Sequence, residues 1–405
     1  GESVVLRPGA TLDVSGGVLQ HEAGFVRTTR LVRGRYLYDM HRATPDVLYD
    51  RVYNGRSSSV SSKWGVTRTY AHALAPLGGF MQQTYLAGAP GGNLNLTAGS
   101  MVLEGNLLGR TVQGPRQMDA AERGSRLALS FLAQKRLDVN ASTFFFIDHS
   151  PVAPAIRLQT GRAGAAGGVP EFVLAGNEAV PLPATVTGSL VLGSSIFDEE
   201  ESGFSELSID NREGNVTLAG AGDITLRPSG ALEVQAANIT LSTGIRAPGG
   251  TVSFVANNYS PFLLDEQTKL GIFGLGPAPD PLPGRGVVAL ASGVRVDTAG
   301  QLVDHRPLGS ATPFEYAALD GGSIRLQGYS VLLPRGTSLD ASGGFKVDAL
   351  GDMYAGNPGD IAILAGQDPV LPTSIGGDLV LQADLAAYGA EAGGSLTIQA
   401  NTVQI

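Results

Sequence analysis

The sequence predicts an all-β fold, a parallel β-helix with insertions that leave the helix. Three observations carry this prediction: apolar triplets recur at a nearly fixed step, turn-forming residues separate them, and one phrase appears near both ends of the chain. The clearest triplets lie between Gly214 and Gly250, and the steps between them are eight, eight and seven residues. They are Val216–Leu218, Ile224–Leu226, Leu232–Val234 and Ile239–Leu241.

Each triplet alternates apolar and other residues, which is typical of a strand with one buried face. Residues such as Gly220, Gly222 and Asn238 fill the gaps and predict corners. Strands this short do not make a stable core as isolated hairpins, but they can if the chain coils and each strand pairs with its equivalent one turn later. Three triplets give a repeat of about 22 residues, the size of a solenoid unit.

This repeat assigns an inward or an outward direction to each side chain. The residues expected to face the core are Val216, Leu218, Ile224 and Leu226. The residues expected to face water are Thr217, Thr225, Glu233 and Thr240. A continuous apolar core and a polar outer surface would follow from this alternation.

The phrase at residues 4–17 nearly repeats at residues 331–344, so a single helix is expected over residues 1–405. Within it, residues 110–205 are expected to form irregular coils with long loops, and residues 287–405 regular coils. Residues 257–286 form a Pro-rich excursion that we expect to be extended, because proline cannot donate ladder hydrogen bonds. The chain ends inside a strand-like phrase, so we expect that the parent protein continues or that another copy stacks there.

Residues 24–90 interrupt the triplets and are predicted to be a basic, Tyr-rich insertion. This stretch contains six of the 11 tyrosines, the single tryptophan, nine basic residues and three acidic residues, so its net charge is +6. Because Tyr, Trp and Arg anchor many recognition surfaces, we expect a ligand surface here. The alternative is an aromatic packing seam between the insertion and the helix. The candidate contact residues are Arg33, Arg35, Tyr36, Tyr38, Tyr49, Tyr53 and Trp64.

Composition restricts the class of protein. The 405 residues carry a net charge of −9, which argues against a nucleic-acid-binding protein as a whole. No apolar run approaches the length of about 20 residues that a membrane span needs, so no transmembrane segment is expected. The chain has no cysteine, and with the expected continuous core this favours a secreted or cell-surface location.

The sequence predicts no catalytic site, no cofactor and no metal site. The five histidines are scattered, and no pair has metal-ligand spacing. Asp148-His149-Ser150 resembles a triad only in its letters, because triad residues meet in space rather than as neighbours. Asp297, Asp340 and Asp348 could line a flank, but Leu-Asp corners belong to the repeat. The acidic run at residues 198–201 is expected to be a solvated loop, with cation binding as the alternative.

The repeat phrases resemble the filamentous haemagglutinin-like exoproteins of two-partner secretion, which are large bacterial surface adhesins. The residues that carry the resemblance are the Gly-Gly-x-apolar-x-apolar phrases, the Leu-Asp-x-Ser-Gly-Gly corners at 12–17 and 339–344, and Met101–Gly105 leading to Gly114–Gln117. It covers most of the chain outside residues 24–90. The family's amino-terminal secretion domain is not recognisable in this sequence.

The resemblance implies a right-handed β-helix, export through a partner transporter in the outer membrane, and a role in adhesion or biofilm formation. The expected function is therefore that of a non-enzymatic surface adhesin: a stalk whose insertions contact a host cell, a neighbouring cell or a glycan. One alternative is a subunit of an extracellular filament that stacks on itself head to tail. A third is a polysaccharide lyase or hydrolase, because right-handed β-helices also host such enzymes.

Overall fold

The structure is a computed structural model dominated by strands, and the predicted all-β class is confirmed. It describes residues 3–40, 43, 47–53, 55–71, 78–112, 114, 124–133, 153–163, 174–175, 178–179, 182–269, 271, 280–304, 306, 318–347, 351–401 and 403–404. The chain forms two compact units, which are described separately: Gly1–Gly17 with Gly88–Ile405, and Val18–Ala87. Within the described residues, no helix is both long and apolar enough to cross a membrane.

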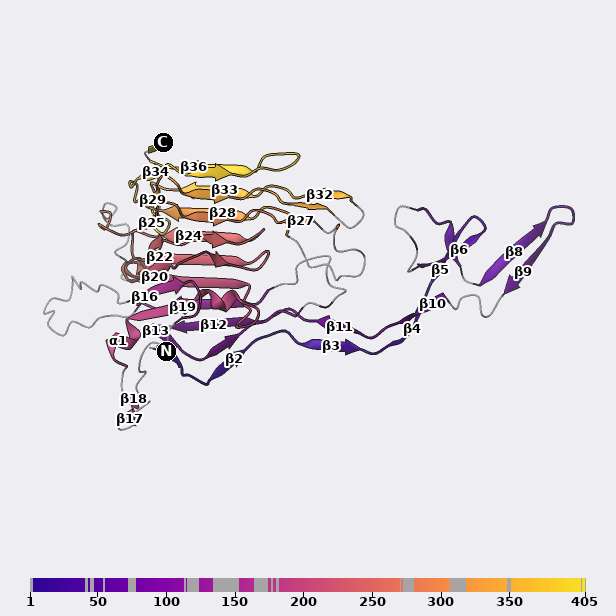
Figure 1. Cartoon of the computed structure of the whole chain (residues 1–405), viewed down its shortest axis with the longest axis horizontal. Helices are drawn as coiled ribbons and strands as arrows, with labels where there is room; N and C mark the ends of the chain where they lie inside the picture. Colours follow the sequence, from indigo (N-terminus) through magenta and orange to yellow (C-terminus); the bar gives the residue numbers. More distant parts are fainter. Residues whose placement is uncertain are drawn as a thin grey trace. The chain divides into compact units, whose positions relative to one another are not determined.

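The first unit is built on a 14-stranded parallel sheet, whose strands lie one above another in Figure 1. One ladder runs through β12 (Asn93–Ala98), β15 (Arg126–Phe131), β20 (Glu206–Ala219), β22 (Ala231–Leu241), β24 (Thr251–Ala256), β28 (Ser323–Gly328), β33 (Asp360–Leu364) and β36 (Ser395–Gln399). A second ladder runs through β19 (Ser189–Gly193), β16 (Ala155–Gln159), β20, β22, β25 (Val287–Leu290), β29 (Ser330–Leu333), β34 (Leu379–Leu381) and β37 (Val403–Gln404). The long strands β20 and β22 belong to both ladders.

The remaining short strand of each repeat, such as the one at Ile224, belongs to a separate parallel sheet. This sheet contains β21 (Ile224–Thr225), β23 (Ile245–Arg246), β26 (Arg295–Asp297), β30 (Ser338–Asp340) and β35 (Asp384–Ala386). Ile224 pairs with Ile245, 21 residues later, and Leu232 pairs with Val252, 20 residues later. Equivalent positions of successive repeats therefore lie side by side.

Smaller elements complete the first unit. Near the N-terminus, β1 (Ser3–Leu6) pairs with β13 (Ser100–Leu103), and β2 (Thr11–Asp13) pairs with β14 (Asn106–Leu108), both in parallel. The short strands β17 (Leu174–Ala175) and β18 (Glu178–Ala179) form an antiparallel pair. Within the described residues, the named helical elements are α1 (Ala184–Thr187), the 3-10 helix η2 (Ser194–Phe197) and α2 (Pro261–Lys269).

The core of the first unit lies on the inward side of these ladders. The predicted inward residues Val216, Leu218, Ile224 and Leu226 are each at most 3% exposed, so their assignment is confirmed. Thr225 and Thr240 are exposed, and Thr217 and Glu233 are partly exposed, as expected for the outer side. In-register pairing places buried aliphatic residues directly above one another, so that each repeat covers the core of the next.

One predicted corner is absent from its expected place. The triplets Leu232–Val234 and Ile239–Leu241 were expected to be separate strands, but both lie in the continuous strand β22. Ala236 and Ala237 are both buried between them, and the pairing of β22 with β20 is irregular at this point. The Asn238 amide holds this part of the strand by accepting from the backbone N–H of Val287 at 3.0 Å and donating to the carbonyl of Gly284 at 2.8 Å.

The excursion at residues 257–286 is not extended throughout, which corrects the expectation from its prolines. It contains α2, and the first turn of this helix is held by two side chains. Ser260 Oγ accepts from the N–H of Leu263 at 3.1 Å, and the Glu213 carboxylate accepts from the N–H of Phe262 at 3.0 Å. Glu213 also forms a buried ion pair with Arg285 at 2.9 Å. Pro277 and Pro279 lie outside the described residues.

A buried carboxylate ties this excursion to a segment about a hundred residues later. Asp368 is 1% exposed, and Oδ2 accepts from the backbone N–H groups of Asn258 and Tyr259. Its Oδ1 accepts from the N–H groups of Val370 and Leu371 at 2.8 and 2.6 Å. One side chain thus satisfies backbone donors of two segments, so it fixes the start of the excursion.

We expect Asp368→Ala to loosen the excursion, because it leaves buried N–H groups without an acceptor at a cost of about 1–3 kcal/mol each. Hydrogen exchange of the backbone around Tyr259 and along α2 should accelerate, while exchange in β28 and β33 stays slow. Asp378→Ala is the matched control, since Asp378 is exposed in the same part of the chain. Equal exchange in both variants would contradict the role assigned to Asp368.

Corners in which Asp follows Leu or Val form one recurring exit from the ladders. In Asp13, Asp297 and Asp340 the carboxylate accepts from the backbone N–H two residues later, at 2.8, 3.0 and 3.0 Å. These bonds are Asx turns, in which a short carboxylate replaces a backbone acceptor. Hydrogen bonds from the side chain and backbone of Ser15 hold the pKa of Asp13 below its usual value.

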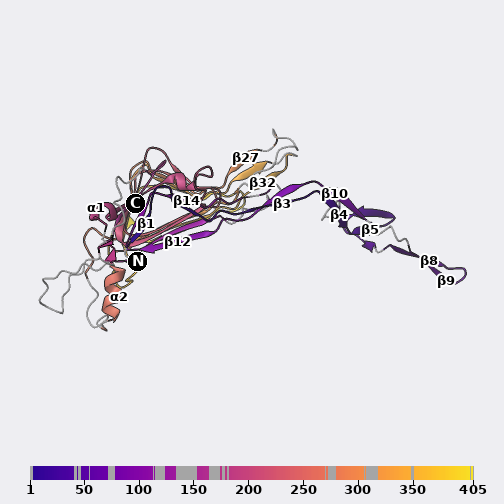
Figure 2. The ribbon, with the colours of Figure 1, turned by 90° about the horizontal axis from the view of Figure 1, so that it is seen from below.

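After each of these corners the chain forms a strand outside the main ladders. β27 (Leu302–Asp304) and β31 (Phe345–Val347) pair in parallel, and β31 pairs antiparallel with β32 (Met353–Ala355). Figure 2 shows β27 and β32 at one end of the stacked strands and α2 toward the other. The corner at Asp13 leads into β3, the first strand of the second unit. An Asx turn therefore precedes each of the three segments that leave the ladders.

The second unit contains small, mostly antiparallel sheets. β3 (Val18–His21) pairs with β11 (Tyr85–Gly88), and β4 (Gly24–Thr28) pairs with β10 (Gly78–Gln82). β5 (Arg30–Arg33) lies between β6 (Tyr36–Asp39) and β7 (Arg51–Tyr53), and β8 (Arg56–Ser61) forms a hairpin with β9 (Val66–Ala71). Val32, at 8% exposed, is the one buried hydrophobic residue among the residues described for this unit.

Candidate functional site

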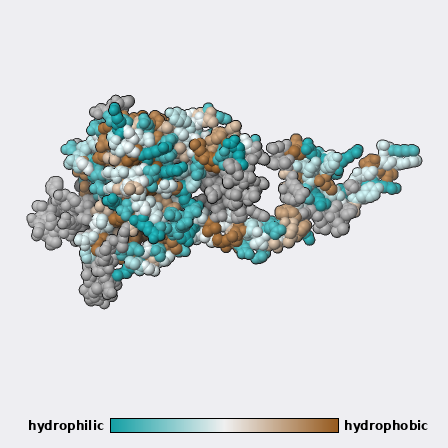
Figure 3. Space-filling view, in the orientation of Figure 1, coloured by the Kyte–Doolittle hydropathy of each residue, from teal (hydrophilic) through white to brown (hydrophobic). Residues whose placement is uncertain are grey.

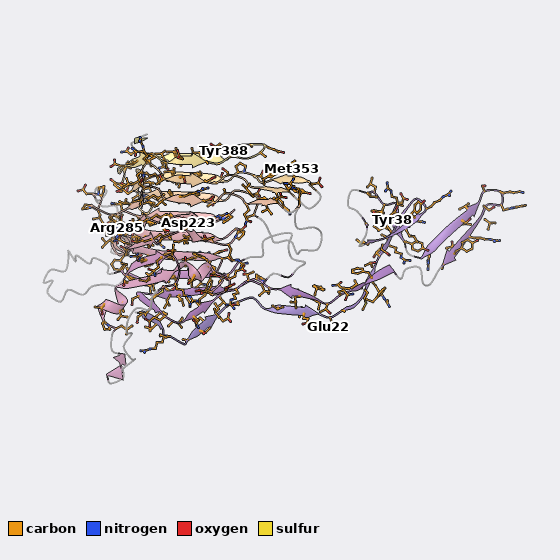
Figure 4. All side chains as sticks on the ribbon, viewed as in Figure 1. Glu22, Tyr38, Asp223, Arg285, Met353 and Tyr388 are labelled. Atoms are coloured by element: carbon orange, nitrogen blue, oxygen red, sulfur yellow. The ribbon has the colours of Figure 1, made fainter. Side chains whose placement is uncertain are left out.

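Four of the predicted contact residues belong to one face of the sheet β6–β5–β7. Arg33 lies opposite Tyr36 across the strand pair, and Tyr38, two residues further along β6, projects to the same face. Tyr38 contacts Tyr49 edge to face, with ring centroids 5.5 Å apart. Figure 4 labels Tyr38 on this sheet. The face therefore combines one guanidinium with three phenol rings.

The turn that joins β5 and β6 presents a second guanidinium. Gly34 and Arg35 form a two-residue connection, and Gly34 has a φ of +60°, a conformation that glycine adopts without strain. The Asp50 carboxylate accepts from the N–H of Gly34 at 2.6 Å and holds the turn. Arg33 and Arg35 are both exposed, so the turn displays two positive charges to solvent.

Tyr53 and Trp64 are not part of this face. Tyr53 lies opposite Arg30 on β7, and the alternation of side chains places this pair on the other side of the sheet. Arg30 forms an ion pair with Asp39 at 3.1 Å, so its charge is largely compensated. Trp64 lies in the turn of the β8–β9 hairpin, where the Lys63 ammonium is 5.1 Å from its ring centroid.

Sequence reasoning missed the residues that hold this surface in shape. Asp39 pairs with Arg30, Asp50 holds the Gly34 turn, and Lys63 lies over Trp64. The first of these could have been found, because a two-residue turn at Gly34 and Arg35 fixes the hairpin register and puts residue 39 opposite residue 30. The other two depend on loop conformations that a single sequence does not specify.

The second unit is basic in an acidic chain. Residues 18–87 contain nine basic and four acidic residues, a net charge of +5, whereas the remaining residues contain 19 basic and 33 acidic ones, a net charge of −14. Tyr36 is 71% exposed and Trp64 is 72% exposed. Exposed guanidinium groups bind carboxylate, sulfate or phosphate groups in a bidentate manner, and aromatic faces pack on flat ligand surfaces.

The acidic run at residues 198–201 is held by arginines. Glu199 pairs with Arg227 at 2.7 Å, Glu201 pairs with Arg162 at 2.7 Å, and Arg110 donates to the carbonyls of Glu200 and Glu201. Two of the four carboxylates of the run are thus paired with arginines of the chain itself. Among the described residues, no group of three or more His, Asp or Glu side chains could hold a metal ion.

A cavity of about 630 Å³ adjoins this loop, between β13 and β14 on one side and β19 and η2 on the other. The apolar part of the cavity wall includes the buried side chains of Met101, Leu190 and Ile196. The polar part includes the Arg162–Glu201 ion pair. The volume is within the range of small-molecule sites.

The remaining candidate residues from the sequence either form part of a turn or lie outside the described residues. Asp297 and Asp340 form the Asx turns described above, and Arg295 lies 3.1 and 3.4 Å from their carboxylates. Residues 148–150 and Asp348 lie outside the described residues.

Comparisons of the chain with protein-family models, with curated proteins and with solved structures find no match. The family resemblance of the repeat phrases therefore stays a prediction.

Proposed function

We propose that this chain is part of a non-enzymatic bacterial surface adhesin of the filamentous haemagglutinin type. In this proposal the parallel ladders of the first unit are faces of a right-handed β-helix that acts as a stalk. Support comes from the in-register pairing of successive repeats and from the buried aliphatic residues that these pairings stack. Secretion to the cell surface through an outer-membrane partner transporter is inferred from the resemblance alone.

The proposed ligand surface is the basic sheet of the second unit, centred on Arg33, Arg35 and Tyr36. The observation that carries this proposal is the concentration of exposed Arg, Tyr and Trp in a unit of net charge +5, attached to a chain that is otherwise strongly acidic. The exposure of Tyr36 and Trp64 favours a ligand surface over a packing seam. An anionic glycan of a host or neighbouring cell fits this chemistry, since guanidinium groups bind its acidic groups and phenol rings pack on its sugar rings.

We expect the double variant Arg33→Gln, Arg35→Gln to lose at least about tenfold in affinity for an immobilised sulfated polysaccharide, because each lost charged hydrogen bond contributes about 1.5–3 kcal/mol. Surface plasmon resonance at several salt concentrations measures both the affinity and its salt slope, which should become shallower.

Arg325→Gln is the matched control, since Arg325 is an exposed arginine of the first unit. It should bind as the unchanged protein does. The proposal fails if the double variant and a deletion of residues 24–90 both retain full binding while circular dichroism reports an unchanged β content.

A further inference from the structure

The hairpin of β8 and β9 stands apart from the other sheets of the second unit. Figure 1 shows it as a two-stranded sheet, and no other described strand pairs with it. Every residue from 58 to 71 is exposed except Ser61, which is partly exposed. A single hairpin buries little apolar surface and is only marginally stable in water. Its side chains are therefore available to a partner.

The tip of this hairpin is a tight turn surrounded by apolar side chains. The backbone N–H groups of Trp64 and Gly65 both donate to the carbonyl of Ser61, at 3.2 and 2.8 Å. Gly65 closes the turn with a φ of +63°, which glycine adopts without strain. Val60 and Val66 occupy neighbouring rungs beside the turn, so they project to opposite faces. They are 67% and 49% exposed, and Trp64 between them is 72% exposed.

The charges that accompany this tip are all positive. The hairpin contains Arg56, Lys63 and Arg68, each of them exposed, and the sequence has no acidic residue from 51 to 87. The Lys63 ammonium lies over the Trp64 ring. Arg68 projects to the same face as Val66, two residues or about 7 Å further along β9. In Figure 3 hydrophobic and hydrophilic surface lie side by side on this hairpin.

This combination fits a lipid surface better than a glycan. Ligand sites for small molecules and sugars are concave, with polar groups that converge on the ligand, whereas this tip is convex and its two valines offer no hydrogen bond. At a membrane surface, Trp rings lie at the level of the headgroups, and anionic lipids attract Lys and Arg. The free edges of the two strands keep their backbone groups hydrated in this layer, which the hydrocarbon core would not allow.

We propose that the tip of the β8–β9 hairpin docks on a bilayer that contains anionic phospholipids. Val60, Trp64 and Val66 enter the interfacial layer, and Lys63 and Arg68 contact the lipid phosphates. The attachment is peripheral, because only the tip carries exposed apolar side chains on both faces of the hairpin and around its turn. It does not depend on the proposed glycan surface, which lies on the separate sheet β6–β5–β7.

The single tryptophan makes this contact measurable in the full chain. We expect vesicles of phosphatidylcholine and phosphatidylserine to shift the emission of Trp64 to shorter wavelength, and lipids brominated near the headgroup end of the acyl chain to quench it. Vesicles of phosphatidylcholine alone should bind at least about tenfold more weakly, because they offer no anionic lipid. The double variant Lys63→Glu, Arg68→Glu should weaken binding to the anionic vesicles at least about tenfold.

Two control variants in the first unit match these changes. Arg325→Glu reverses the charge of an exposed arginine, and Tyr388→Ala removes an aromatic ring that is 73% exposed. Neither should alter vesicle flotation, whereas Trp64→Ala should reduce it several-fold. Circular dichroism checks that each variant keeps its β content.

An unshifted Trp64 emission with anionic vesicles would overturn the proposal, and so would equal vesicle binding by the double variant and by Arg325→Glu. A Trp64 shift with a sulfated polysaccharide but not with vesicles would assign the tip to a glycan instead. Polysaccharide binding through Arg33 and Arg35 is measured on their own double variant, so either proposal can fail without the other.

Discussion

Leu226→Asp is expected to destabilise the first unit by more than about 4 kcal/mol, and the protein should fail to reach its folded state at physiological temperature. Leu226 is 3% exposed, and its backbone N–H donates to the carbonyl of Arg246 at 2.8 Å, so the side chain is buried and its backbone is held in the ladder. The substitution removes about 1.5–3 kcal/mol of apolar burial and adds the larger penalty of an unpaired buried carboxylate.

The neighbouring residue provides the control. Thr225 is exposed and lies opposite Arg246 in the parallel pair β21–β23, so Thr225→Asp adds a charge beside an opposite one. Its effect should stay within about 1 kcal/mol. Leu226→Ala, expected to cost about 2–5 kcal/mol, gives a measurable value if the aspartate variant does not fold. Urea unfolding followed by circular dichroism measures all three, and similar midpoints for the two aspartate variants would contradict the inward assignment of Leu226.

The inward and outward positions could be predicted because they depend only on local alternation. A strand places successive side chains on opposite faces, so the triplet at Ile224–Leu226 determines which residues are buried once a ladder forms. The same argument failed at Asn238, which looked like a corner residue. There the decisive feature is a pair of side-chain hydrogen bonds to Gly284 in the later excursion and to Val287 at the start of β25, and no local sequence pattern predicts them.

Non-local contacts explain most of what the sequence did not reveal. Asp368 and Asn258 are 110 residues apart, and the acceptor role of Asp368 depends on two loops that meet only in the folded chain. In the candidate site, the strand pairing of Arg33 with Tyr36 follows from the Gly34 turn, whereas the contact between Tyr38 and Tyr49 depends on the path of the intervening loop. The seven candidate contact residues, which were grouped by composition, therefore lie on two faces of the sheet β6–β5–β7, in its turn and on a separate hairpin.

The repeated Gly-Gly phrases also acquire a physical meaning in the structure. A glycine precedes each of the strands β22, β24, β28, β33 and β36, and these glycines lie above one another in a column. They are Gly230, Gly250, Gly322, Gly359 and Gly394. A Cβ atom on Gly322 would lie 1.9 Å from the carbonyl oxygen of Gly250, and one on Gly359 would lie 1.8 Å from that of Gly322. Each backbone therefore occupies the space where a side chain of the next repeat would begin.

Gly322→Ala is accordingly expected to destabilise the first unit by at least about 2–3 kcal/mol, because the added methyl group must displace a backbone carbonyl. That carbonyl, of Gly250, accepts from the N–H of Ser323 at 2.9 Å, so the shift also disturbs the pairing of β24 with β28. Gly393→Ala is the control, since a Cβ atom there meets nothing within 4 Å. It should be neutral or stabilising by about 0.4–1 kcal/mol through the unfolded state.

Far-UV circular dichroism follows the ladders, while fluorescence of the single tryptophan, Trp64, reports on the second unit. Gly322→Ala should lower the unfolding midpoint measured by circular dichroism and leave the midpoint measured by tryptophan fluorescence unchanged. An equal shift of the circular dichroism midpoint in both glycine variants would contradict the close-packing role of the column.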